Sequence, residues 1–379
     1  MTTTTATRMQ IPLSQPSISQ DDIDAVLAVL QTTTLSIGPQ VRAFEEAVAA
    51  YTGVAEAVAV NSGTSGLHAC LAASEIGPGD EVITSPFSFV ASANCAIYQG
   101  ATPVFADIEP DTLNIDPAQI EAKLTDRTRA IIPVDVFGQP ADIDGIAAIA
   151  RQHDLTIVQD ACEAIGAERN GQRVGSHPDV KAAVFAFYPN KQMTTGEGGI
   201  VVTDDPAYAR VLRSLANQGR DDAGTWMNHV RLGYNYRLDE MSAALGRTQI
   251  ARLDDILARR AQVAAWYTER LSAVDAVTVP YVAPETTRMS WFVYVIRLDP
   301  RIDRTELIAC LDAEGVPSRP YFVPIHLQPY YRERYGFKPG DFPVTEKIAE
   351  TTLAIPFFSD MSLEQVEYVV DCIKAAVLR

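Results

Sequence analysis

The sequence predicts an α/β protein with a large domain and a smaller C-terminal α/β domain. We expect the large domain to contain a mostly parallel, seven-stranded sheet flanked by helices. Two observations support this fold class. Short apolar runs alternate with helix-like segments in the first half of the chain, which is typical of a parallel sheet covered on both faces. The chain also has 379 residues, 47% of them hydrophobic, enough to bury the cores of two lobes.

Seven apolar runs supply the strands of the predicted sheet. Each run is short and is separated from the next by a segment with helical character, so consecutive strands can lie parallel. We therefore expect them to pair in one sheet at the centre of the large domain. The runs cover residues 57–60, 81–84, 103–106, 130–134, 155–159, 182–187 and 199–203.

The second half of the chain predicts a linking helix and a smaller domain. Residues 239–271 carry leucine and isoleucine at helical spacing, so we expect one long helix there. Residues 291–298 have the composition of a strand, and residues 304–314 and 363–377 that of helices. Four prolines within residues 317–329 exclude regular structure in that segment.

The ends of the chain and its cysteines indicate a soluble, cytoplasmic protein. We expect a flexible tail at residues 1–10, a large domain at 11–250 and a small domain at 251–379. The tail lacks the apolar segment of a secretory signal, and no later run is long enough to span a bilayer. The cysteines are odd in number and show no CxxC spacing, which predicts neither a disulfide framework nor a metal site. They are Cys70, Cys95, Cys162, Cys310 and Cys372.

The charge of the chain restricts its partners. The formal net charge is -17, and binding to nucleic acid or to an anionic membrane requires a basic face. The composition therefore argues against both classes of partner. An anionic substrate would have to be held by donors placed locally.

The most informative stretch is residues 185–199. It places Lys191 between an apolar, aromatic run and a glycine-rich turn. A partly apolar site disfavours the charged form of an amine, which is what a lysine that forms a Schiff base requires. The alternative is a solvated lysine at the end of a strand, because lysine is seldom buried.

A candidate phosphate site follows the first predicted strand. Residues 61–66 read Asn-Ser-Gly-Thr-Ser-Gly and lead into a helix-like run. Gly63 lets the backbone approach an anion, and the hydroxyls of Thr64 and Ser65 add donors at a helix N-terminus. A plain helix cap is the alternative, since Ser and Thr are common caps. The stretch is neither a Walker A loop nor a dinucleotide-binding fingerprint.

Asp160 directly follows the predicted strand at 155–159, at the edge where ligands of open α/β sheets collect. Its carboxylate could pair with a protonated ring nitrogen and keep it charged, in a hydrogen bond worth roughly 1.5–3 kcal/mol. For an unaccompanied Asp at this place, capping the next segment is the commoner role.

Two aromatic residues and one turn complete the candidate site. Phe87 and Phe89 flank Ser88, and alternation allows only one of the two rings to face the strand ends. That ring could stack on a flat cofactor, although core packing is the commoner role. Residues 233–237 form a polar, aromatic turn whose Asn235 and Arg237 could reach phosphate or carboxylate oxygens, or could simply lie on the surface.

These features together resemble pyridoxal-phosphate (PLP) enzymes of the aspartate-aminotransferase fold, fold type I. From about residue 11 onward, the chain is similar to the DegT/DnrJ/EryC1/StrS family of sugar aminotransferases. The resemblance rests on residues 36–39 with Phe44 and Glu45, and on residues 61–67, 77–84, 160–164, 188–199, 233–237 and 326–329.

The resemblance implies how a cofactor is held. Lys191 would form the Schiff base and later move the proton, and Asp160 would pair with the pyridinium nitrogen. Gly63, Thr64 and Ser65 would hold the phosphate. Family members use PLP, with pyridoxamine 5'-phosphate as the intermediate form, so ping-pong kinetics are expected.

The resemblance also implies a homodimer with shared sites. Phe89 matches the aromatic residue that stacks on the cofactor ring, and Asn235 would reach the phosphate in the neighbouring subunit. Two positions depart from the family pattern. Ala186 replaces a common serine phosphate ligand. Glu163 stands where Gln or His is usual near the phenolic oxygen, and a carboxylate would repel a phenolate unless it is protonated or turned toward the substrate.

The implied reaction is transfer of the amino group of L-glutamate to a nucleotide-linked keto sugar. Residues 190–193, 217–220 and 324–331 look most like members that act at C4 of 4-keto-6-deoxyhexoses, such as perosamine synthases. The candidates for contact with either substrate are Arg220, Arg237, His326 and Tyr321. Surface ion pairs are the alternative role for such charged side chains.

Three other functions compete with this one. Within the family, the chain could act at C3 or on a cyclitol or aminoshikimate-type ketone. Sugar dehydratases of the same fold carry histidine in place of the lysine, so Lys191 argues against that activity. A PLP-responsive transcription regulator would need a DNA-binding module, which the early start of the large domain and the negative charge disfavour.

Overall fold

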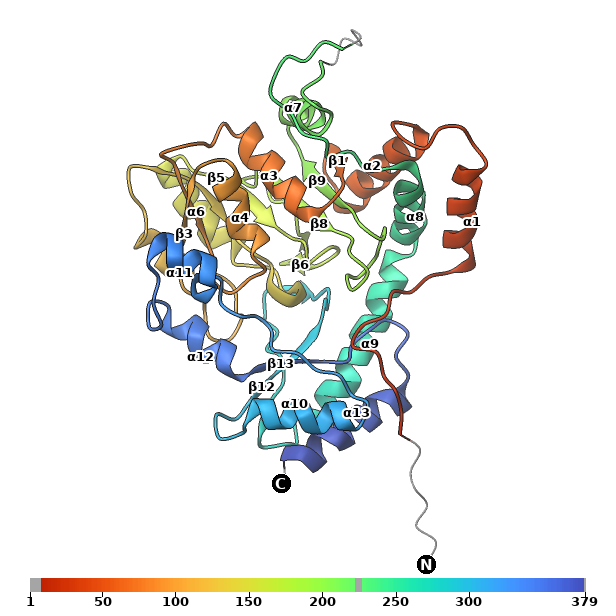
Figure 1. The fold of residues 1–379 in the computed structure, drawn as a ribbon, viewed down its shortest axis with the longest axis vertical. Coiled ribbons are helices and arrows are strands. Elements are labelled where there is room, and N and C mark those ends of the chain that lie inside the picture. The colour runs from red at the N-terminus through yellow and green to blue at the C-terminus, as the bar shows by residue number, and fades with distance from the viewer. Residues whose placement is uncertain (1–7, 222–226, 378–379) are drawn as a thin grey trace, which may run out of the picture.

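A seven-stranded sheet forms the centre of the large domain in the computed structural model, which describes residues 8–221 and 227–377 (Figure 1). Strand β9 runs antiparallel to its neighbours β1 and β8, and the remaining neighbours pair in parallel. The predicted mostly parallel sheet and all seven predicted strands are confirmed. The strand order is β1 (Glu56–Val60), β9 (Gly199–Thr203), β8 (Ala182–Ala186), β5 (Thr156–Asp160), β4 (Thr128–Ile132), β2 (Glu81–Thr84) and β3 (Thr102–Phe105).

Helices cover both faces of this sheet because each strand buries side chains on both sides. Apolar residues of β1, β5 and β8 point alternately into two separate clusters. One cluster contains α2 (Pro39–Thr52), α6 (Ile143–His153) and α8 (Glu240–Ala251), and the other α3 (Gly63–Ala73), α4 (Ala91–Tyr98) and α7 (Pro206–Ala216). Smaller elements are α5 (Pro117–Glu121), η1 (Val136–Gly138), β6 (Glu168–Arg169), β7 (Gln172–Arg173) and β11 (Thr286–Arg288).

The predicted helix at 239–271 is two helices. Helix α8 ends at Ala251 and α9 (Leu253–Leu271) begins after Arg252, whose backbone (φ -117°, ψ 15°) is not helical. At this break Gln249 and Arg252 both donate to the buried carboxylate of Asp22 in α1 (Gln20–Leu30), at 2.7 Å each. The junction between α8 and α9 is therefore tied to α1.

Helix α9 carries the chain into the small domain, which lies at the lower end of the molecule together with the first and last described residues (Figure 1). A three-stranded antiparallel sheet pairs β12 (Tyr294–Leu298) with β10 (Val277–Thr278) and β13 (Thr352–Ile355). Ile11 is buried in the same apolar cluster. The domain boundaries stay a prediction. The other helices are α10 (Arg304–Ala313), η2 (Ile325–Leu327), α11 (Pro329–Tyr335), α12 (Pro343–Thr351) and α13 (Leu363–Val377).

The predictions for this region are close to the structure. The strand expected at 291–298 begins only at Tyr294, because Trp291 has a positive φ of 52°. The proline-rich segment contains one short 3-10 turn, η2, before α11 starts at Pro329. Among the described residues, no helix combines the length and the apolar character that crossing a membrane requires.

One buried carboxylate joins the start of α8 to the start of α2. Glu240 accepts hydrogen bonds from the N–H groups of Gly38 (2.9 Å), Gln40 (2.8 Å) and Val41 (3.2 Å), groups that have no partner within α2. Gly38 is needed for this approach, since a Cβ there would lie 2.7 Å from a carboxylate oxygen of Glu240.

We expect Glu240→Ala to lower the free energy of unfolding by about 2–3 kcal/mol, because it leaves the first N–H groups of α2 buried without an acceptor. Urea denaturation followed by circular dichroism measures this change. Glu46→Ala is the matched control: Glu46 is an exposed carboxylate on α2, and its loss should change stability by less than about 0.5 kcal/mol. Equal stability of the two variants would contradict the capping role.

Candidate active site

A cavity of about 410 Å³ opens at the carboxyl ends of the parallel strands. Loops that follow β1, β2, β4, β5 and β8 form most of its wall, and the small domain closes one side with Phe292, Tyr321 and Phe322. The structure brings most of the predicted site residues to this cavity. They are Gly63, Thr64, Phe89, Asp160, Glu163, Lys191 and Tyr321.

Asp160 is the last residue of β5 and is buried at the wall of the cavity. Its Oδ2 accepts a hydrogen bond from the Ser92 hydroxyl at 2.6 Å, and its Oδ1 accepts one from the Cys162 N–H at 3.2 Å. The carboxylate is therefore fixed in direction. Ser92 also shares a hydrogen bond of 2.7 Å with Ser88, which lines the cavity.

Lys191 lies in the turn after β8, where its N–H donates to the carbonyl of Tyr188 at 2.9 Å. Only 13% of its side chain is exposed. The Nζ atom is 3.5 Å from Oε1 of Glu163 and 3.8 Å from the centre of the Phe292 ring. A freely solvated lysine at a strand end is therefore excluded by the structure.

Glu163 uses its two oxygens for different partners. Oε2 accepts the N–H of Phe137 at 2.9 Å, and Oε1 faces Lys191. Burial raises the pKa of Glu163 above its ordinary value, although the nearby ammonium of Lys191 opposes this. The structure thus turns the unusual carboxylate toward the lysine and the Phe137 backbone.

The candidate phosphate site is the N-terminus of α3. The Ser62 hydroxyl caps the helix by accepting from the N–H of Ser65 at 3.1 Å, while Gly63 and Thr64 line the cavity. A Cβ at Gly63 would lie 2.7 Å from Cys162 Sγ and 2.8 Å from the Ala186 Cβ, so only glycine fits. The Ser65 hydroxyl instead donates to Asn61 Oδ1 at 2.7 Å and is not among the cavity residues.

The aromatic residues divide as alternation predicts. Phe87 is fully buried in a core cluster, whereas Phe89 is 62% exposed and lines the cavity. Tyr321 lines the same cavity, and burial raises the pKa of its hydroxyl well above the ordinary value.

Besides Ser65, four predicted site residues lie outside this cavity. Asn235 is exposed, and its carbonyl accepts from the Asn61 side chain at 3.3 Å. Arg220 lies where the chain pairs with His229, beyond the end of α7. His326 is completely buried with Nε2 3.0 Å from Oε1 of Glu346, and burial lowers its pKa although Glu346 opposes this. The fourth, Arg237, lines a different cavity.

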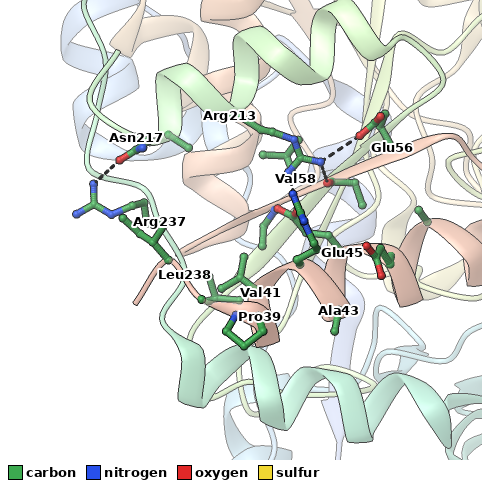
Figure 2. Close-up of a pocket in the computed structure, with 18 of the residues that line it drawn as sticks. Pro39, Val41, Ala43, Glu45, Glu56, Val58, Arg213, Asn217, Arg237 and Leu238 are labelled. Atoms are coloured by element: carbon green, nitrogen blue, oxygen red, sulfur yellow. Dashed lines mark hydrogen bonds and ion pairs between the residues drawn. The ribbon is translucent and has the colours of Figure 1, made fainter. Parts of the chain in front are cut away.

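That second cavity is larger, about 990 Å³, and lies between α2, α7 and β1, the edge strand of the sheet (Figure 2). Figure 2 shows Arg213 directed toward Glu45 and Glu56, and Arg237 paired with Asn217 at 3.0 Å. Neither Asp160 nor Lys191 lines it. Size alone would select this cavity, but the reactive groups select the smaller one as the candidate active site.

Sequence reasoning missed several residues at the smaller cavity or next to it. Ser92, in the first turn of α4, binds Ser88 and Asp160 through its hydroxyl, and no sequence pattern indicated that contact. Nothing in the sequence connects Phe292 with Lys191. Asn190, next to Lys191 in the chain, also lines the cavity, and its Oδ1 is buried without a partner.

Comparison with known proteins agrees with this geometry. The model of the DegT/DnrJ/EryC1/StrS aminotransferase family matches residues 16–374. The chain belongs to this family. The expected fold type I and the transaminase class are thereby confirmed.

Individual relatives are similar over nearly their whole length. The spore coat polysaccharide biosynthesis protein SpsC of Bacillus subtilis is 39% identical, covering 97% of each chain. The GDP-perosamine synthase of Caulobacter vibrioides is also 39% identical, covering 95% of this chain and 96% of its own.

Solved structures of the family superpose closely. DesV of S. venezuelae, solved in complex with a ketimine intermediate, is 37% identical with a TM-score of 0.89, covering 94% of each chain. A Streptococcus pneumoniae protein in its PLP-form is 27% identical with a TM-score of 0.90, covering 97% of this chain and 98% of its own.

We expect Glu163→Gln to stabilise the cofactor-free protein at alkaline pH. Because the pKa of Glu163 is raised in the folded chain, the folded state binds a proton more readily than the unfolded state, and stability falls as pH rises past the ordinary carboxyl range. Glutamine does not ionise, so the variant does not lose stability in this way. The gain in unfolding free energy should be absent below that range and grow above it.

Urea denaturation at a series of pH values measures this gain. Glu197→Gln is the matched control, since Glu197 is an exposed carboxylate that lines the same cavity. Its difference from the parent should be small. A pH-independent difference for Glu163→Gln would show that burial of this carboxylate costs nothing.

Proposed function

We propose that this aminotransferase uses PLP to transfer the amino group of L-glutamate to C4 of a nucleotide-linked 4-keto-6-deoxyhexose. The observation that carries the proposal is the cavity that holds the buried amine of Lys191 together with the fixed carboxylate of Asp160. Similarity to GDP-perosamine synthase supports the sugar class and the C4 position.

The residues of the cavity fit PLP. Gly63 leaves a cradle that a Cβ would fill, and the first turn of α3 offers N–H groups and the Thr64 hydroxyl to a phosphate. Asp160, held by Ser92, would pair with the ring nitrogen through its carboxylate. Ala186 lines the same place without a hydroxyl, so the backbone of α3 would carry more of the phosphate binding.

The protein's own groups would orient the reactants and move the proton. When bound, PLP supplies an electron-withdrawing ring that stabilises negative charge at the substrate carbon. Asp160 favours the protonated ring nitrogen on which this depends. Lys191 Nζ would take the α-proton of glutamate in the first half of the cycle and would give a proton to the sugar carbon in the second half. Phe89 and Phe322 would cover the ring and exclude water.

The keto sugar is the finer part of the proposal. Tyr321 is the one sequence-predicted substrate contact among the residues that line the small cavity. Arg220, Arg237 and His326 lie outside it, so any contact with substrate would reach the site from a neighbouring subunit or after a movement of the chain. Action at C3, or on a cyclitol-type ketone, is the alternative within the family.

The proposed assembly is a homodimer in which Asn235 serves the partner's cofactor. Asn235 is exposed and does not line the cavity of its own chain, which supports action across an interface. We also propose the cytoplasm as the compartment, because all five cysteines are free.

We expect the purified protein to show a yellow absorption band that L-glutamate bleaches. The band reports cofactor joined to Lys191, and transfer of the amino group removes it. Lys191→Ala should lack this response, while Lys181→Ala, which alters a lysine paired with Asp205, should keep it. A nucleotide-linked 4-keto-6-deoxyhexose should restore the band.

The position of the new nitrogen in the product, read by NMR, then separates C4 from C3 action. A protein that stays colourless and inert after PLP is added would overturn the cofactor assignment. If glutamate bleaches the band but the 4-keto sugar does not restore it, the aminotransferase assignment stands and the proposed keto sugar is wrong.

We expect Lys191→Ala and Asn235→Ala chains to complement each other when co-expressed. Each variant alone should be nearly inactive. If Asn235 acts in the partner's site, each mixed dimer has one intact site, and random pairing gives about a quarter of wild-type activity. Wild-type activity in Asn235→Ala, or a fully active monomer in sedimentation, would contradict the shared site.

A further inference from the structure

The side chain of Lys191 contacts two groups of opposite character. The Glu163 carboxylate is 3.5 Å from Nζ, and the centre of the Phe292 ring is 3.8 Å from it. The face of an aromatic ring carries partial negative charge and attracts an ammonium group, more strongly where water is excluded. Phe292 is 1% exposed, so this contact is made in a desolvated place.

The backbone around Phe292 is fixed from the small-domain side. Arg260 of α9 is fully buried and donates from Nε to the Trp291 carbonyl at 2.7 Å and from Nη2 to the Phe292 carbonyl at 2.6 Å. Its third group, Nη1, donates to the Ser359 hydroxyl at 3.1 Å. One guanidinium thus holds two successive carbonyls, as its planar fork permits.

The same backbone is fixed from the large-domain side. The Phe292 N–H donates to the Phe137 carbonyl at 3.1 Å, and the Phe137 N–H donates to Glu163. Gly138 allows the two segments to meet, because a Cβ there would lie 2.7 Å from the Trp291 nitrogen. The peptide groups of Phe137 therefore position both partners of the lysine amine.

We propose that Glu163 and Phe292 form a resting place for the Lys191 ammonium in the part of the cycle when the lysine is not joined to the cofactor. This inference rests on the proposed function. The four-carbon stem of a released lysine can adopt many conformations. The carboxylate and the ring hold its amine at the edge of the cavity, close to where it next accepts or gives a proton. Arg260 is a positioning residue for Phe292.

The test uses the cofactor-free protein, where the lysine is free and no turnover is needed. Formaldehyde with a borane reductant methylates the neutral form of an amine, and peptide mass spectrometry gives the rate at Lys191. The exposed Lys338 and Lys347 of the same chain serve as internal standards. We compare the parent with Phe292→Leu, which removes the ring, and Phe292→Tyr, which retains it.

We expect Phe292→Leu to raise the labelling rate of Lys191 at neutral pH by about 2- to 30-fold, the factor that corresponds to a cation–ring contact of usual strength. Phe292→Tyr should label like the parent. The ratio between Phe292→Leu and the parent should fall toward one as rising pH removes the proton from the amine. A simple gain in access would leave the ratio the same at every pH.

Three outcomes would each overturn the proposal. They are equal labelling of Lys191 in the parent and Phe292→Leu, a ratio of these two rates that is constant with pH, and equal rates in Phe292→Leu and Phe292→Tyr. Phe292→Met replaces Phe292→Leu if the latter lowers the melting temperature, since methionine fills an irregular space. In the Arg260→Lys variant, Lys191 should be labelled faster than in the parent but more slowly than in Phe292→Leu. No step of the labelling test involves cofactor or substrate. A negative labelling result would therefore leave the aminotransferase proposal untouched. Equally, failure of the absorption test with PLP and glutamate would not change the labelling rates.

Discussion

The common direction of β2, β4, β5 and β8 is the constraint on which the candidate site depends. Parallel strands end at the same edge of a sheet, so the segments that follow them converge there. Ser88, Val134, Asp160 and Lys191 reach one place from four parts of the chain in this way. The reversed strand β9 adds to this arrangement. It begins at Gly199, where a Cβ would lie 2.6 Å from the Ser62 backbone, so the returning chain packs against the start of α3.

The parts of the site that could be predicted are those set by local pattern. Asp160 follows an apolar run, Gly63 and Thr64 stand between a strand and a helix, and alternation separates Phe89 from Phe87. Each of these depends on residues nearby in the chain. The direction of these side chains can therefore be predicted from the sequence without knowledge of any tertiary contact.

The parts that could not be predicted depend on contacts between distant segments. Phe292 reaches Lys191 only because Arg260 and Gly138, on different elements, fix its backbone. At the break between α8 and α9, Arg252 pairs with a carboxylate in α1, far earlier in the chain. His326 lies in a motif typical of the family, yet its neighbour Glu346 and the ring of Phe342 enclose it. No spacing rule encodes such pairs.

The edge strand β1 has a consequence for how copies of the chain can associate. An edge strand normally offers unpaired backbone groups to which another chain can add a strand. Here the Ala59 N–H donates to Glu45 at 2.8 Å, and the Ala57 carbonyl accepts from Arg213 at 2.9 Å. Side chains of α2 and α7 have thus taken the hydrogen-bonding positions that an added strand would use. Another chain that added a strand at β1 would have to displace these two bonds, so it would meet side chains of α2 and α7 before it reached the strand backbone.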